Sequence, residues 1–412
     1  MTMRLLVMPL FVLAINSDEA FYGLLMATAG YVQALFLLPG GTLSDKKGRG
    51  PAMAIGGAIS GAAFFMLPHV ETPITVLTVF ALTGVGDGLM MNAVDALIAD
   101  HTQKGAERTK SYGVAIGVAT FAATIGPFVG GAILDENTLP FLGSPLARFA
   151  LLFYIMGTFR LLSGIGGLYT ERWLRAKSFG RHGLANRPDS PHDDSPNTTR
   201  SDDARTAFLF GVGQLLMGIS SGMVIPYLIP WIYAAFRPEE LVLGGLSSAA
   251  NITLASGTLI VGMVSERAGK LKTVFILYLL VPLLTVGIVT SEVFLVMAVF
   301  YVVREALANM TRPATNSLFM EQVNVARRGT SWAVTRIMWH FPRQTGTLIT
   351  SVLLGTGVFG GIVDFGTIVF PIAMVLYPLS VIPMYVAVRL NSRTLQTAAA
   401  CVGPQQEQGS LL

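Results

Sequence analysis

Long apolar stretches alternate with short polar segments along almost the whole chain. Each stretch approaches or exceeds the roughly 20 helical residues that are needed to cross the hydrocarbon core of a bilayer. Because lipid cannot satisfy free backbone groups, these stretches are predicted to be transmembrane helices. There are eleven of them, at Phe21–Pro39, Ala52–Pro68, Ile74–Ile98, Tyr112–Leu134, Phe149–Tyr169, Ala207–Phe236, Leu243–Val264, Val274–Thr290, Val293–Leu318, Ser331–Phe359 and Phe365–Val388.

The N-terminus departs from this pattern. Leu5–Ile15 is apolar but only about half as long as a crossing requires, with Arg4 before it and the polar run Asn16–Glu19 after it. A secretory signal peptide also has a short apolar core behind a basic residue, although no small-residue cleavage site follows here. We interpret the segment as the second half of a first helix whose start is missing, as a start codon assigned too late would produce.

The composition agrees with a membrane location. Hydrophobic residues occupy 52% of the 412 positions and charged residues only 13%, whereas soluble domains carry about 25% charged residues. So few charges cannot cover the surface of a soluble protein of this length. The single cysteine, Cys401, excludes an internal disulfide and a thiolate metal cluster.

Charge in the connecting segments alternates in sign. One side carries Lys46, Lys47, Arg49, Lys104, Arg108, Lys110, Arg172, Arg175, Lys177, Arg181, Arg267, Lys270, Lys272, Arg327, Arg328, Arg389 and Arg393. The other side carries Asp18, Glu19, Glu71, Asp135, Glu136, Glu239, Glu240, Glu292 and Asp364, with Arg148 and Arg237 as exceptions. Because basic residues concentrate in cytoplasmic loops, we expect a multi-pass protein of the plasma membrane with both termini in the cytoplasm.

A polar segment divides the chain into two similar lobes. Residues 171–206 are rich in Pro, Ser, Asp and Asn and are predicted to form a cytoplasmic linker between transmembrane bundles at 1–170 and 207–390, with a polar tail at 391–412. Gly41–Arg49 (GTLSDKKGR) and Gly262–Lys270 (GMVSERAGK) carry Gly, Ser, acid, base, Gly and base at the same offsets. Asp100 and Glu321 close equivalent helices, so the lobes are interpreted as a duplicated six-helix unit.

Two motifs resemble those of the major facilitator superfamily. Its signature loop, G-x-L-[AS]-D-x-x-G-R, is matched by Gly41, Leu43, Ser44, Asp45, Gly48 and Arg49, and its antiporter-associated motif G-P-x-x-G-G by Gly126, Pro127, Gly130 and Gly131. The resemblance implies an all-α integral membrane protein of two pseudo-symmetric six-helix bundles, here with the first helix truncated. It also implies that the bundles rock about a central site lined by helices one, four, seven and ten.

The chain departs from the family patterns at two positions. Proton-coupled members often carry R-x-x-x-G in the fourth helix, whereas here Phe80 lies four residues before Gly84. The fuller antiporter motif has more glycines upstream, and Ala122 stands where one is expected. Both departures count against proton antiport, but not against the fold.

The motif loops are candidates for a gate. The predicted gating residues are Gly41, Asp45, Gly48, Arg49 and Asp100 in the first lobe and Gly262, Glu266, Lys270 and Glu321 in the second. Arg49 should reach Asp100, and the resemblance implies that such clusters latch the lobes on the cytoplasmic side in the outward-facing state. The alternative is that they only fix topology and cap helices. Pro226 and Pro230 should break or bend the seventh helix, which suits gating, and the alternative is the ordinary tolerance of Pro in membrane helices.

Charged side chains within the apolar stretches mark a candidate site. A charge at the bilayer centre costs about 2.5–3.5 kcal/mol, so it should face the bundle interior. Asp87 and Asp95 lie roughly 80° apart around the fourth helix, and Glu305 and Arg312 belong to a stripe about 40° wide on the tenth, with Arg304 to its side. The predicted substrate and ion contacts are Asp87, Asn92, Asp95, Gln214, Glu305, Asn309, Arg312, His340 and Arg343.

The eleventh helix carries Arg336, His340 and Arg343 on one face. These groups could receive an anionic group of a substrate or neutralise the buried acids. Arg336 lies near the cytoplasmic end, where internal pairing is the simpler interpretation, and Arg343 is the deeper candidate. Arg160, in the sixth helix, has no evident partner.

These features predict a secondary transporter rather than an enzyme. The sequence has no nucleotide-binding loop, no metal-ligand cluster and no nucleophile–base arrangement, so no cofactor is expected beyond a proton or other ion gradient. We predict a monomer that moves a small organic solute across the bilayer by alternating access, with proton-coupled export as the first hypothesis, and no nucleic-acid partner. A buried carboxylate would carry the proton, because burial disfavours its charged form. The alternatives are a facilitative uniporter and a sensor or scaffold that transports nothing.

Overall fold

The computed structural model describes residues 2–15, 18–70, 72–100, 106–178, 200–323 and 328–390, and the regular structure in these ranges is entirely helical. The first lobe contains α1 (Thr2–Ala14), α2 (Glu19–Lys47), α3 (Arg49–Met66), α4 (Pro73–Asp100), α5 (Ala106–Leu134) and α6 (Pro145–Ser178). The second contains α7 (Arg200–Val224), α8 (Leu228–Phe236), α9 (Glu240–Ala268), α10 (Lys270–Thr290), α11 (Phe294–Gln322), α12 (Arg328–Gly355), α13 (Ile362–Met374), α14 (Leu376–Leu379) and a last helical segment at 381–390.

The eleven predicted stretches all coincide with these helices, which confirms the all-helical membrane fold. Most helices continue past the predicted ends, and α6 reaches Ser178 in the segment interpreted as linker. The expected break in the seventh helix is also present, because a 3-10 turn at Ile225–Tyr227 separates α7 from α8. Pro226 within that turn has no amide hydrogen to donate to the helical ladder.

Seven helices in the described ranges are long and apolar enough to cross a membrane. Two further apolar segments, Met3–Ala14 and Val118–Leu134, are shorter. The first of them lies in α1, the segment that we interpreted as part of a helix. Helices α11 and α12 carry charged residues within their length, which lowers their hydropathy.

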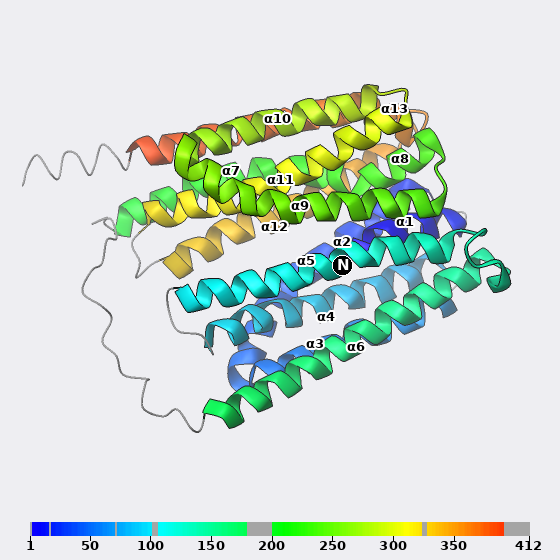
Figure 1. Ribbon diagram of the computed structural model, residues 1–412, viewed down its shortest axis with the longest axis horizontal. Coiled ribbons are helices and arrows are strands. Elements are labelled where there is room, and N and C mark those ends of the chain that lie inside the picture. Colours follow the sequence, from blue (N-terminus) through cyan, green and yellow to red (C-terminus); the bar gives the residue numbers. More distant parts are fainter. Residues whose placement is uncertain are drawn as a thin grey trace, which may run out of the picture.

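The helices run roughly parallel to the long axis of the molecule and form two bundles (Figure 1). In the first lobe α3 packs on α6 and α4, and α2 packs on α4. In the second lobe α12 packs on α7, and α11 packs on α9 and α10. The lobes meet along two helix pairs, α5 with α9 and α2 with α12. This arrangement of two six-helix units is the duplication that the sequence predicts.

The α5–α9 contact brings two backbones close together through the helix-five motif. A side chain at Gly131 would meet the Gly244 Cα at 3.0 Å, and one at Gly244 would meet the Pro127 carbonyl oxygen at 2.5 Å. The Ser248 hydroxyl donates to the Thr124 carbonyl at 2.7 Å across the same contact. Because small residues let helices approach in a membrane, Gly131 and Gly244 set the distance between the lobes here.

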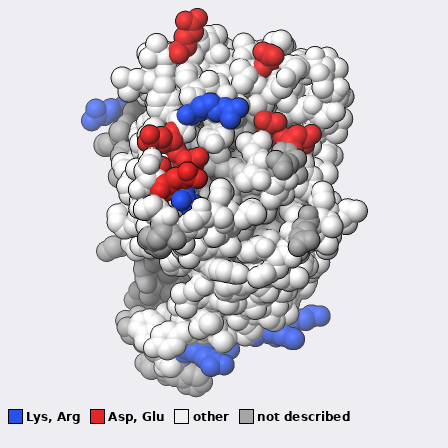
Figure 2. All heavy atoms as spheres, turned by 90° about the vertical axis from the view of Figure 1, so that its right-hand side faces the viewer, with Lys and Arg blue, Asp and Glu red and all other residues white. Residues whose placement is uncertain are grey.

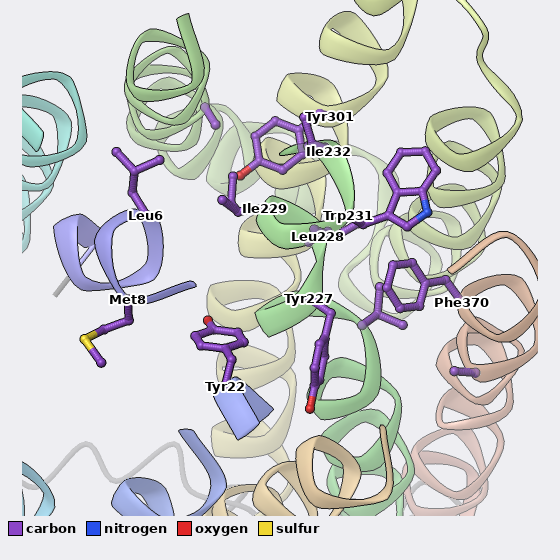
Figure 3. Close-up of a cluster of buried hydrophobic side chains, with 14 of the residues drawn as sticks. Leu6, Met8, Tyr22, Tyr227, Leu228, Ile229, Trp231, Ile232, Tyr301 and Phe370 are labelled. Atoms are coloured by element: carbon purple, nitrogen blue, oxygen red, sulfur yellow. The ribbon is translucent and has the colours of Figure 1, made fainter. Parts of the chain in front are cut away.

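Aromatic rings and hydroxyl groups join α2 to the second lobe. The rings of Tyr22 and Tyr227 meet edge to face with their centroids 6.0 Å apart (Figure 3). The Ser351 hydroxyl donates to the Ala20 carbonyl at 2.6 Å, and the Tyr31 and Thr345 hydroxyl oxygens lie 2.8 Å apart. Within the second lobe the Tyr227 hydroxyl donates to the Thr347 carbonyl at 2.8 Å, which fixes the Tyr227 ring. These uncharged contacts of α2 hold the two lobes together.

The two adjacent glycines of α9 provide a matched test of this packing. Gly244→Ala should destabilise the folded protein by about 1–3 kcal/mol, because the new methyl group overpacks the contact with Pro127. Gly245→Ala should leave the stability unchanged or slightly raised, since nothing lies within 4 Å of the position that its new methyl group would occupy. Thermal unfolding of the purified variants in detergent measures both, and equal midpoints would contradict the proposed role of the α5–α9 contact.

Candidate functional site

Asp87 lies between two arginines inside the first lobe. Its Oδ1 is 2.8 Å from an Arg160 guanidinium nitrogen, and its Oδ2 is 3.4 Å from one of Arg4. The Asp87 side chain is only 5% exposed and that of Arg4 only 8%. The Arg4 guanidinium also lies over the Phe80 ring, 5.4 Å from its centroid. Three helices, α1, α4 and α6, therefore contribute to one buried ionic cluster, which we call the Asp87 triad (Arg4, Asp87, Arg160).

The Asp87 triad supplies the partner that the sequence did not reveal for Arg160. It also changes the interpretation of Asp87, which the sequence suggested as a substrate or ion contact. With both arginines charged, the triad carries a net charge of +1. Desolvating an ion costs several kcal/mol unless it is paired, so Asp87 is first of all the counter-ion of the buried Arg4 and the partly exposed Arg160.

The second lobe buries an ion pair on α11. Arg304 is completely inaccessible, although the sequence placed it beside the polar stripe, and its Nη1 donates to Oε1 of Glu305. The Glu305 side chain keeps 19% of its surface exposed. Arg304 Nε and Nη2 have no hydrogen-bond partner among the described residues. The pair is neutral, but its arginine retains unused donors.

Glu305 lines a cavity that both lobes enclose. The lining residues are Leu5, Leu6 and Pro127 from the first lobe and Ile225, Pro226, Leu228, Ile229, Ser247, Ala250, Asn251, Leu254, Tyr301 and Glu305 from the second. One wall is apolar, and the other offers a carboxylate, an amide and two hydroxyl groups. The volume of about 90 Å³ is well below the roughly 300–1,000 Å³ that is typical of a site for a small organic molecule. A larger solute therefore requires the lobes to separate.

The structure describes four of the other predicted substrate and ion contacts: Gln214, Asn309, His340 and Arg343. Arg343 on α12 stacks on the Trp339 ring, 5.3 Å from its centroid, and His340 meets the same ring edge to face. Gln214 is half-buried in α7, and Asn309 donates its side-chain amide to the Glu305 carbonyl at 2.9 Å. The side chains of Asn92, Asp95, Gly262, Glu266, Lys270, Arg312, Glu321 and Arg336 lie outside those described.

The signature loop forms an ionic cluster at the basic end of the first lobe. Arg49 Nε donates to Asp100 Oδ2 at 2.9 Å, which confirms the expected contact between the motif and the foot of α4. The same guanidinium donates to the Ser44 hydroxyl at 3.0 Å and to the Asp45 carboxylate. Gly41 lies within α2. The cluster ties α2, α3 and α4 to one another, within a single lobe.

Glu171 on α6 caps this loop, and sequence reasoning did not identify it. Its carboxylate accepts the Gly50 amide at 2.6 Å and the Arg49 amide at 3.1 Å, both in the first turn of α3. Arg175, one turn later on α6, donates to the same carboxylate at 2.5 Å. Gly48 precedes α3 and has a backbone φ of 103°, which residues with a side chain rarely adopt. A negative charge at a helix N-terminus is stabilising, because it satisfies free amides and opposes the helix dipole.

The opposite end of the molecule contains a second, larger hollow of about 650 Å³. Its charged lining residues are Glu19, Asp135, Glu136, Arg148, Arg237, Glu239 and Glu240, from both lobes. Figure 2 views this end and shows acidic side chains gathered around arginine. Within the described ranges, no group of three His, Cys, Asp or Glu residues is arranged to hold a metal ion.

Comparisons with known proteins give consistent results. A family model described as Major Facilitator Superfamily matches residues 1–343. The multi-drug resistance efflux pump PmrA of Streptococcus pneumoniae is 33% identical over 166 residues, which cover 38% of this chain and 38% of the pump. The match therefore spans much less than half of that relative.

Solved structures resemble the chain over nearly its whole length. A bacterial homologue of the human lysosomal transporter Spinster, in an inward-facing and occupied conformation, has a TM-score of 0.68 at 15% identity and covers 96% of this chain and 94% of its own. The nucleoside transporter NupG has a TM-score of 0.68 at 14% identity, covering 92% of this chain and 94% of its own. At such identity these likenesses concern the fold alone.

The charge arithmetic of the Asp87 triad predicts an order of stability. Asp87→Asn leaves the buried Arg4 and the partly exposed Arg160 without a counter-ion and should cost about 3–5 kcal/mol. Arg4→Gln leaves the neutral Asp87–Arg160 pair and should cost much less. The double variant Arg4→Gln/Asp87→Asn leaves one unpaired cation instead of two, and that cation is the partly exposed one, so it should be more stable than Asp87→Asn alone. Thermal midpoints in detergent give the order, and a double variant less stable than both single ones would refute it.

The cap provided by Glu171 predicts a local effect. Glu171→Ala removes the acceptor of two amides at the start of α3 and should destabilise the protein by about 0.5–2 kcal/mol, the range for losing a helix cap. Hydrogen exchange of the Gly50 amide should accelerate as well. The exposed neighbour Arg172 provides the control, and Arg172→Ala should change neither quantity.

Proposed function

Because the chain belongs to the Major Facilitator Superfamily and is a membrane transporter rather than an enzyme, we propose that it exports a small organic solute in exchange for protons. The observation that carries this proposal is the position of Glu305. Its partly exposed carboxylate lines a cavity bounded by both lobes. A titratable group in that position could bind the solute or a proton, and it lies between the two lobes that move relative to each other.

Glu305 suits a coupling role better than Asp87 does. Asp87 is held by two arginines and is almost completely buried, so neutralising it would leave both cations without a counter-ion. Glu305 has one arginine partner through Oε1, and its side chain reaches the cavity. Protonation of Glu305 would leave one arginine, Arg304, without its counter-ion, whereas protonation of Asp87 would leave two. A basic group of a solute and a proton would then compete for one carboxylate, which is the requirement for exchange.

Alternating access follows from the two-lobe architecture. The enclosed cavity is too small for a typical organic solute, so solute binding and release require separation of the lobes. In the proposed cycle the Arg49 cluster contributes to closing the basic end, which we assign to the cytoplasm together with both termini. The acidic hollow at the other end is then the outer vestibule of a protein in the plasma membrane.

Two resemblances support export as the direction of transport. The motif Gly126–Gly131 resembles one associated with antiporters, and the partial relative PmrA is named as a multi-drug resistance efflux pump. Phe80, four residues before Gly84, departs from the arginine motif of many proton-coupled members. The buried carboxylate on α11 is accordingly our candidate for the coupling group, in place of a fourth-helix arginine.

Reconstitution into proteoliposomes tests the proposal. An imposed pH gradient should accelerate the flux of at least one compound in a panel of small aromatic amines, acids and amphoteric compounds. Glu305→Gln should reduce the gradient-driven component at least about tenfold and should also weaken solute binding, because the same carboxylate receives the proton and the basic group of the solute. The matched control, Glu292→Gln, changes an exposed carboxylate near the start of α11 and should transport like the unmodified protein.

The alternatives predict different results in the same assay. Flux that ignores the pH gradient in the unmodified protein would indicate a facilitative uniporter. The absence of flux for every compound, in either direction, would refute transport of this solute class. Gradient-driven flux that survives Glu305→Gln unchanged would remove Glu305 from the coupling role.

A further inference from the structure

Several buried polar atoms close to the junction of the lobes have no hydrogen-bond partner among the described residues. Two of them are Arg4 Nε and the Tyr22 hydroxyl, on side chains that are almost completely inaccessible. More than about 90% of buried polar groups in folded proteins are paired with protein or ordered water. Unused donors on two neighbouring helices therefore indicate a position where a ligand group belongs.

A cationic residue of the other lobe lies on a helix that packs against the same α2. Arg343 belongs to α12, and both α12 and α1 pack on α2, the helix that carries Tyr22. The charges of Arg4 and Arg343 both act on the Tyr22 hydroxyl. Arg343 is held in place by stacking on Trp339. In Figure 3 the Tyr22 hydroxyl points towards the side of the aromatic cluster where Leu6 and Ile229 lie, and both of these line the central cavity.

The chemistry of this group favours an anion. Guanidinium groups only donate hydrogen bonds, and a tyrosine hydroxyl donates readily to a carboxylate. The Asp87 triad, to which Arg4 belongs, has an excess positive charge, which a negative group nearby would balance. Arg4 directly precedes Leu5 and Leu6, two residues of the cavity wall.

The other side of the cavity favours the opposite charge. Glu305, Asn251, Ser247 and the Tyr301 hydroxyl form its polar wall, and all four can accept a hydrogen bond. Arg304 donates to Oε1 of Glu305. The second oxygen is the one that a protonated amine would approach.

We propose that Arg4, Tyr22 and Arg343 bind the carboxylate of an amphoteric solute whose basic nitrogen faces Glu305. The inference rests on the proposed transport function and specifies its substrate class as small molecules that carry both an amine and a carboxylate around an apolar body. The apolar side chains of Leu5, Leu6 and the α8 segment pack against that body.

Three compounds with one skeleton test the charge requirement directly. Phenylalanine carries both charges, its methyl ester only the amine, and N-acetylphenylalanine only the carboxylate. Binding to the purified protein in detergent, measured by calorimetry at pH 7, should be at least about tenfold tighter for phenylalanine than for either derivative. Binding is measured without a gradient, so its outcome is independent of whether transport is coupled to protons.

The decisive variant is Tyr22→Phe, because it removes only a hydroxyl that has no hydrogen-bond partner among the described residues. It should leave the thermal midpoint unchanged and weaken the binding of phenylalanine about tenfold, while the methyl ester binds as before. Tyr227→Phe is the matched control. Its hydroxyl donates to Thr347, so its loss should lower the midpoint and leave the ratio between phenylalanine and its ester intact.

Each other result overturns the inference. If the methyl ester binds as tightly as phenylalanine, the site lacks an anion-binding part, even if proteoliposomes still show gradient-driven flux of other compounds. If N-acetylphenylalanine binds as tightly as phenylalanine, the amine does not contribute. If none of the three binds at millimolar concentration, or if Tyr22→Phe leaves every affinity unchanged, the assignment to Arg4, Tyr22 and Arg343 is wrong.

Discussion

The cost of keeping ionised side chains away from water constrains the whole structure. Each buried ion loses several kcal/mol of solvation, which only a well-placed partner restores. In the first lobe this requirement draws α1, α4 and α6 around Asp87. In the second it fixes Glu305 beside the inaccessible Arg304. The helices that carry charge are therefore positioned relative to one another by electrostatics, and the apolar residues fill the space that remains.

The contacts between the lobes are of another kind. The ion pairs of the Asp87 triad, of the Arg49 cluster, of Glu171 with Arg175 and of Arg304 with Glu305 each lie within one lobe. Glycine packing, aromatic rings and hydroxyl-to-carbonyl hydrogen bonds join α5 to α9 and α2 to α12. Neutral hydrogen bonds contribute only about 0.5–1.5 kcal/mol each. Each bundle is thus tied internally by these ion pairs, whereas the contacts described between the bundles are uncharged.

The fold could be predicted from the sequence because hydropathy, loop charge and the internal repeat all reflect a single physical cause, the apolar solvent around the helices. The Arg49–Asp100 contact could be predicted too, since the motif fixes one partner and the foot of α4 the other. The partners of Arg160 and Arg304 could not, because helix periodicity gives the face of one helix but not its rotation against another. The role of Glu171 could not be predicted either, because the groups that donate to its carboxylate are backbone amides, which every residue except Pro carries.

The capping of α3 by Glu171 makes the signature loop dependent on a residue 121 positions away along the chain. The loop therefore cannot be transferred to another protein without the helix that carries Glu171. Chimaeras that exchange the loop between transporters, or that join the first three helices of one protein to the last three of another, would separate the amides from their acceptor. Recombination is therefore better tolerated at the linker between the lobes than anywhere inside the first bundle.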